Sequence, residues 1–151
     1  MNQIIQRATS VIFYTLLLKA SLPFGFYFVS KYYFLKAIFY YLLLPINLIE
    51  SLFQYGGLGA FSNLILFLIL FAAVVRNPNV PYFVRYNACQ ALLLDIALII
   101  MSYLLRILTL ADLGLILFVF ILSIFIYSVF QCINGVEPEI PFISKSVRMQ
   151  I

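Results

Sequence analysis

Long runs of apolar residues, separated by short breaks of polar, glycine and proline residues, dominate the chain. Such runs are typical of helices that cross a bilayer, because a transmembrane helix needs about 20 mostly apolar residues. The pattern predicts an all-α integral membrane protein with four such helices in a single membrane domain. Their expected ranges are about 36–54, 57–75, 86–108 and 112–134.

A fifth apolar run, at residues 4–22, is shorter and contains Arg7 and Lys19. It is followed at once by Pro23 and Gly25, and both residue types interrupt helices. We therefore expect an N-terminal interfacial or re-entrant segment here, with a fifth span as the alternative.

Single residues refine the ends and the shape of the predicted helices. Pro45 lies inside the first predicted span and predicts a kink. Gly135 follows Asn134 directly and predicts a C-terminal cap for the last span. Residues 135–151 contain two prolines near their start, which predicts an extended tail.

The basic residues favour one orientation in the membrane. With four spans, the side that holds both termini collects eight of the nine Lys and Arg residues, and the opposite side has Arg106 alone. This asymmetry follows the positive-inside rule, and a five-span arrangement weakens it. We therefore predict two tight antiparallel hairpins, joined by the basic loop 76–85, with both termini on the basic side.

Composition supports the membrane assignment and narrows the chemistry. Of 151 residues, 66% are hydrophobic and 9% are charged, whereas a soluble domain has about 25% charged residues. Too few charges are present for a nucleic-acid-binding protein. The chain has no His, and Cys89 and Cys132 lie in apolar runs as expected for buried thiols. The five carboxylates show no metal-binding spacing, so we predict no enzyme, no catalytic residue, no metal site and no cofactor.

Polar residues inside the last two predicted spans suggest a contact between them. Ionisable groups at membrane depth are costly and should face protein. Folding these spans about their short turn places Asp95 level with Tyr127, which predicts that their polar faces meet in a hydrogen bond. The same folding places Gln90 near the depth of Gln131 and Cys132.

A second pairing joins Glu50 and Arg106. Both residues lie at a shared depth near the opposite-side ends of their spans, which predicts an ion pair. The polar residues within the spans either line a substrate path or join helices, and both interpretations stay open.

Several short motifs resemble one family, the twenty-kilodalton Tic component of the protein-import translocon in the chloroplast inner envelope, with its cyanobacterial relatives. The first group lies before and within the third span, and the second group covers the end of the fourth span and the tail. In order, they are Val74-Val75-Arg76-Asn77, Phe83-Val84-Arg85-Tyr86-Asn87, Gln90-Ala91-Leu92-Leu93-Leu94-Asp95-Ile96, Ile126-Tyr127-Ser128-Val129-Phe130-Gln131, Gly135, Glu139-Ile140-Pro141-Phe142-Ile143-Ser144 and Val147-Arg148-Met149-Gln150.

This resemblance implies a four-helix subunit with both termini in the stroma that contributes to a preprotein-conducting path. The partners it implies are other Tic subunits, the Toc complex, transiting preproteins and membrane lipid. No transit peptide is recognisable, so the chain is more similar to the plastid-encoded or cyanobacterial branch, and the cyanobacterial plasma membrane is the alternative location. The positions expected to form a polar cleft or a subunit contact are Arg76, Asn77, Arg85, Asn87, Gln90, Asp95, Tyr127 and Gln131.

Packing geometry limits what a single copy can do. Four helices, each about 10 Å in diameter, fill their own centre and leave no aqueous bore. A conduit would therefore need further copies of the chain or other subunits. The alternative functions are a small-solute carrier and a structural scaffold in another membrane complex. Carriers bind substrate at broken helices near the midplane. Pro45, the residue expected to break a span, lies far from Asp95 in sequence, which disfavours the carrier interpretation.

Overall fold

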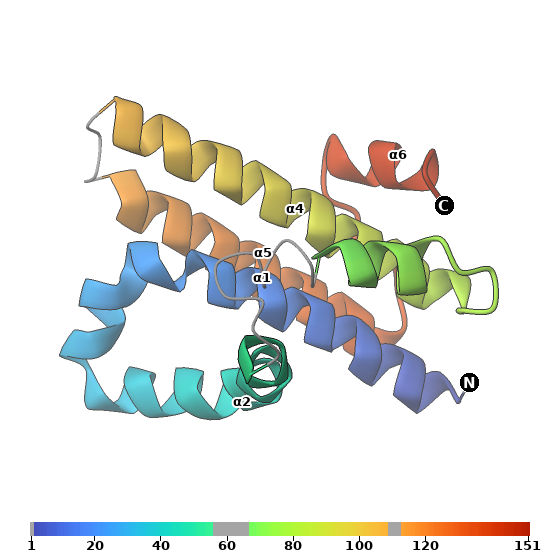
Figure 1. The fold of residues 1–151 in the computed structure, drawn as a ribbon, viewed down its shortest axis with the longest axis horizontal. Coiled ribbons are helices and arrows are strands. Elements are labelled where there is room, and N and C mark those ends of the chain that lie inside the picture. The colour runs from blue at the N-terminus through green and yellow to red at the C-terminus, as the bar shows by residue number, and fades with distance from the viewer. Residues whose placement is uncertain (1, 56–66, 109–112) are drawn as a thin grey trace.

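The structure, a computed structural model, describes residues 2–55, 67–108 and 113–151, and the regular elements within these ranges are helical (Figure 1). Two long helices come first, then a short π-helix, two further long helices and a short helix in the tail. In chain order they are α1 (Gln3–Lys31), α2 (Tyr33–Tyr55), η2 (Phe71–Val75), α4 (Tyr82–Ile107), α5 (Gly114–Asn134) and α6 (Ile143–Arg148).

Helix α1 runs for 29 residues and contains Pro23. The prediction that this run ends at Pro23 and Gly25 is therefore wrong. Proline removes one main-chain hydrogen bond and bends a helix without always ending it, and Figure 1 shows α1 changing direction along its length. The helix continues because its second part is packed: Ser21, Gly25 and Val29 are buried.

Among the described residues, three helices are long and apolar enough to cross a membrane: Gln3–Lys31, Tyr82–Leu105 and Gly114–Asn134. The last two match the predicted spans 86–108 and 112–134. Helix α2 covers the predicted span 36–54, and within its described side chains Tyr33–Leu48 form an apolar helix. Most of the predicted span 57–75 lies outside the described residues, and its described end, 67–75, is helical.

Helix α2 continues through Pro45. Figure 1 shows its ribbon turning between the cyan first part and the teal second part, in agreement with the predicted kink. In the tail, residues 136–140 form neither helix nor strand, whereas Ile143–Arg148 form a short helix that the prediction of an extended tail missed.

The helices pair differently from the second predicted hairpin, and most of the second span of the first hairpin lies outside the described residues. Helix α1 packs against α4, α5 and α2, whereas α4 and α5 do not pack closely along one another over the described residues. The N-terminus, the start of α4, the end of α5 and the tail lie at one end of the bundle (Figure 1). The connection from Lys31 to α2 lies at the other end. Lys31, the last residue of α1, therefore lies at the end of the bundle opposite the N-terminus.

Apolar side chains fill the interior and also cover the outside. Tyr14, Leu17 and Leu18 of α1 pack into one core with Phe118 of α5 and Leu92 of α4. Many large apolar residues of α4 and α5 are exposed instead, among them Ile99, Ile100, Ile116, Phe120, Ile126 and Phe130. An apolar exterior of this kind suits a helix surrounded by lipid.

A buried polar network at the end of the bundle that holds both termini

Tyr14 of α1 lies at the centre of a polar network inside the bundle. Its side chain is fully buried, and its hydroxyl lies 3.0 Å from Asn87 Oδ1 and 3.0 Å from Gln90 Oε1 of α4. Both contacts cross between helices. A hydroxyl has one hydrogen to donate, so the two amide oxygens share it.

Asn87 connects this network to α5. Its Nδ2 donates to the main-chain oxygen of Phe83 at 2.7 Å, which holds the side chain against its own helix. Its Oδ1 also accepts from Cys132 Sγ of α5 at 3.3 Å. Asn87 therefore joins α1, α4 and α5 at one point, about one helical turn before Gln90, the residue that the sequence placed near the depth of Cys132.

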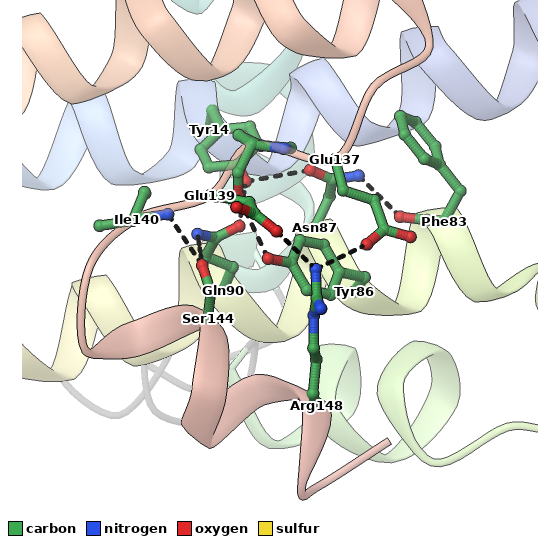
Figure 2. Close-up of polar contacts among 11 residues, drawn as sticks. Tyr14, Phe83, Tyr86, Asn87, Gln90, Glu137, Glu139, Ile140, Ser144 and Arg148 are labelled. Atoms are coloured by element: carbon green, nitrogen blue, oxygen red, sulfur yellow. Dashed lines mark hydrogen bonds and ion pairs between the residues drawn. The ribbon is translucent and has the colours of Figure 1, made fainter.

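Gln90 connects the network to the tail (Figure 2). Its Nε2 donates to Ser144 Oγ at 3.4 Å, and the same oxygen accepts from the main-chain N–H of Ile140 at 2.8 Å. Ser144 lies in α6, which packs on α4. The tail therefore folds back over the first turns of α4.

A second group of contacts clasps the tail from outside. Tyr86 donates its hydroxyl to the main-chain oxygen of Pro138 at 3.2 Å. Arg148 lies 2.8 Å from a Glu139 oxygen and 3.6 Å from a Glu137 oxygen, with its guanidinium 5.9 Å from the centre of the Tyr86 ring. Figure 2 shows both glutamates turned toward Arg148.

The clasp favours the charged form that Arg148 has in any case. Desolvation lowers the pKa of Arg148, but Tyr86, Glu139 and Glu137 raise this pKa more, so its net shift is upward.

Arg85 and Cys89 extend these contacts along α4. Arg85 donates from Nε to the main-chain oxygen of Val75 at 2.9 Å and from Nη2 to that of Ile151 at 2.9 Å. The first bond satisfies a carbonyl at the end of η2. Cys89 Sγ lies 3.5 Å from Gln150 Oε1. One face of α4 thus holds both η2 and the far end of the tail.

Arg7 supplies a separate contact at the end of α5. Gly135 adopts a left-handed conformation with φ of 74° and caps α5, as the Asn134-Gly135 pair predicted. Arg7 Nη1 donates to the main-chain oxygen of Ile133 at 2.8 Å. A cation at a helix C-terminus is favourable because the last carbonyls carry partial negative charge.

The structure gathers three of the eight predicted site residues, Arg85, Asn87 and Gln90, around this network. Arg76 lies nearby, with its guanidinium 5.6 Å from the centre of the Phe71 ring. Asn77 accepts from the main-chain N–H of Asn79 at 3.0 Å, which shapes the loop before α4.

Asp95, Tyr127 and Gln131 are not part of the network. No side-chain hydrogen bond or ion pair joins any of them to another residue within 2–55, 67–108 and 113–151. The predicted bond between Asp95 and Tyr127 is therefore absent from the described structure. The reason is that α4 and α5 do not meet along their length, because each packs on α1.

The predicted ion pair between Glu50 and Arg106 involves side chains that lie outside the described residues, so it stays a prediction.

Sequence reasoning missed Tyr14, Ser144 and Arg148. A signal for Tyr14 was present, because Ser10, Tyr14, Ser21 and Gly25 share one face of α1 and are all buried. Small and hydroxyl-bearing residues at helical spacing are typical of helix contacts within membranes. Pro23 and Gly25 conceal this face in the sequence, because they suggest that the segment ends early.

The side chains of the network are suited to joining helices rather than to reacting with a substrate. Its members are amides, hydroxyls and thiols that mostly satisfy one another, and Ser128 Oγ is the one buried side-chain oxygen without a partner in the described part of the chain. No group of three His, Cys, Asp or Glu residues could hold a metal ion, as far as the structure describes the chain.

Long apolar helices joined by a closed polar network define an all-α protein of membrane type. The chain belongs to the Tic20-like family of the chloroplast import apparatus, because the family model matches residues 3–147. The resemblance inferred from the motifs is thereby confirmed.

Three relatives give the range of similarity. Protein TIC 20-v, chloroplastic, of Arabidopsis thaliana is 32% identical over 60% of this chain, and the match spans about half of that relative, 48%. A Tic20 family protein of Synechocystis is 31% identical, over 96% of this chain and 92% of the relative. Protein TIC 20-II, chloroplastic, of Arabidopsis is 29% identical, over 97% of this chain and 72% of the relative.

Proposed function

We propose that this protein is a membrane subunit of the plastid inner-envelope import translocon and contributes helices to a path for preproteins. Membership of the Tic20-like family carries the proposal. The expected partners are other Tic subunits, the Toc complex and the transiting preprotein, and the protein has no enzymatic role. The expected orientation places both termini in the stroma, or in the cytosol if the membrane is a cyanobacterial plasma membrane.

The packing supports a path shared between subunits. The space where α1 meets α4 and α5 is filled by Tyr14, Leu17, Leu18, Leu92 and Phe118, each at most 2% exposed. A polypeptide would therefore pass along the outside of this bundle, against other copies or other subunits.

The exposed face of α4 is the place to test this. Tyr82 and Tyr103 are 48% and 60% exposed and lie near opposite ends of the helix. A photo-reactive amino acid at each position should form adducts with a preprotein arrested in transit. Adducts with neighbouring membrane subunits alone, while import proceeds, would contradict a role in the path.

A scaffold subunit is the second candidate, and one observation favours it. Asn87 and Gln90 are fully buried and bonded to other parts of the chain, as expected for residues that join helices. The two candidates share the same packing, so the adducts decide between them. A small-solute carrier has less support, because the buried polar network lies at the end of the bundle that holds both termini, whereas carriers bind near the midplane.

A further inference from the structure

The tail segment 136–142 occupies a surface of α4 in the manner of an extended peptide. Its chain is non-helical, and Pro138 and Ile140 are buried while the side chains of Glu137 and Glu139 are 30% and 71% exposed. Alternate residues of an extended chain point to opposite sides. The surface therefore receives the side chains of Pro138 and Ile140, while Val136 and Phe142 at the two ends of the segment stay exposed.

The contacts at this surface fall largely on the main chain. Tyr86 of α4 donates to the carbonyl of Pro138. The N–H of Ile140 is bonded within the tail, to Ser144 Oγ, which Gln90 of α4 contacts in turn. Contacts of this kind do not depend on which side chains the segment carries, and they are the means by which extended peptides of varied sequence are bound. Tyr86 would serve another extended chain as well as it serves this one.

The tail is held in a way that permits release. Its ion pairs to Arg148 of α6 lie within the tail and are partly exposed, so they contribute little to holding it on α4, because water screens such pairs. The bond from Gln90 to Ser144 is long, at 3.4 Å, and that from Cys89 to Gln150 uses a thiol, which is a weak donor. The segment ends at Phe142, which has a φ of 69° and is 91% exposed. A bulky residue with positive φ is strained, and release would relieve that strain.

We propose that the first turns of α4, centred on Tyr86, form a binding site for an extended polypeptide, and that segment 136–142 occupies this site until a transiting chain displaces it. The ligand class is an unfolded stretch of preprotein with apolar residues at alternate positions. This inference rests on the proposed function, because it takes the displacing chain to be the preprotein.

The tail can be locked with one substitution. Cys89 is a native, buried thiol beside Gln150, so Gln150→Cys places two thiols together, and mild oxidation would bridge them directly in a disulfide. In the bridged full-length chain, segment 136–142 stays on α4, because it is fixed between the end of α5 and the bridge at Cys89. The double variant Cys89→Ala with Gln150→Cys cannot be bridged and is the matched control.

A photo-reactive amino acid at Tyr82 reports occupancy of the site, because the Tyr82 ring lies 6.2 Å from the Tyr86 ring. Tyr103 is the control position, about 32 Å further along the same helix. With a preprotein arrested in transit, bridging should reduce adducts at Tyr82 at least tenfold and leave those at Tyr103 within twofold. Cleavage of the bridge should restore them.

A second variant tests release without a bridge. Replacing both Glu137 and Glu139 by Gln removes the clasp and should raise the Tyr82 adducts two- to fivefold. Lys145→Gln, which removes an exposed charge from α6 outside the clasp, should not change them.

The outcomes separate the two proposals. Tyr82 adducts that do not respond to the bridge, or thiols at 89 and 150 that cannot be bridged, would overturn the binding site and leave the translocon role standing if Tyr103 still forms adducts. Adducts at neither position in any variant, while import proceeds, would overturn the translocon role and the binding site together.

Discussion

Replacing Tyr14 by Phe tests whether the buried network holds the bundle together. The substitution removes one hydroxyl and leaves the shape of the ring unchanged. It deprives two amide oxygens, Asn87 Oδ1 and Gln90 Oε1, of the hydrogen that they share. Asn87 Oδ1 keeps its contact with Cys132 at 3.3 Å, so Gln90 bears most of the loss.

The expected cost follows from two measured ranges. Hydrogen bonds between membrane helices contribute about 0.6 kcal/mol on average and up to about 1.7 kcal/mol. A buried acceptor left without a partner adds a desolvation penalty of about 1–3 kcal/mol in general. Because Gln90 can adjust its side chain, we expect Tyr14→Phe to lower the free energy of unfolding by about 1–2 kcal/mol.

Unfolding by SDS in mixed micelles, followed by far-ultraviolet circular dichroism, measures this free energy. Tyr127→Phe is the matched control, since the Tyr127 side chain is 41% exposed and its hydroxyl has no partner among the described residues. It should change the free energy by less than about 0.5 kcal/mol.

Two results would refute the reasoning. One is a cost for Tyr14→Phe within about 0.3 kcal/mol of zero, below the average membrane hydrogen bond. The other is an equal or larger cost for Tyr127→Phe, which would revive the predicted bond to Asp95. A double-mutant cycle of Tyr14→Phe with Gln90→Met should give a coupling of about 0.5–1.7 kcal/mol.

Three further predictions concern packing, capping and orientation. Gly25→Ala should destabilise the chain by about 1–3 kcal/mol in the same SDS titration, because the added Cβ would lie 2.5 Å from the Phe118 ring. The control Gly114→Ala should cost less, because its Cβ would lie 3.3 Å from its nearest neighbour. Equal costs for the two substitutions would contradict the close contact at Gly25. Gly135→Ala should cost about 1–2 kcal/mol, because φ of 74° disfavours Ala and the Cβ would lie 2.7 Å from Arg7. Gly135→Asn should cost less in the same titration, since Asn tolerates this conformation. A larger cost for Asn than for Ala would contradict the capping role. Single cysteines introduced near each end of the chain should react with an impermeant thiol reagent from one side of the membrane, while buried Cys89 and Cys132 stay unlabelled; labelling from opposite sides would refute the shared orientation.

The parts of the fold that could be predicted from sequence are those set by local pattern. Helices α4 and α5 coincide closely with apolar runs, and Gly135 caps α5 where a glycine after Asn134 suggested it. Pro45 lies inside α2, which turns along its length. Each of these features depends on residues close together in the chain.

The network could not be predicted in this way, because its bonds join distant residues. Tyr14 lies 73 residues before Asn87, and Gln90 lies 54 residues before Ser144. The prediction of a bond between Asp95 and Tyr127 assumed that the consecutive helices α4 and α5 pack together. In the structure, each of them packs against α1 instead. Pro23 concealed this role of α1, because proline is expected to interrupt a helix and the predicted segment therefore ended there. In the structure, packing sustains α1 beyond Pro23.

The separation of Tyr14 from Asn87 also constrains the order of events during biosynthesis. If helices enter the bilayer in the order of translation, α1 arrives with its tyrosine hydroxyl unsatisfied in lipid and must wait for α4. The first helix would therefore be kept near the insertion machinery, or be sheltered by another protein, until the later ones emerge. Maturation of this protein would then depend on late synthesis, and premature termination before α4 would leave an early product prone to degradation.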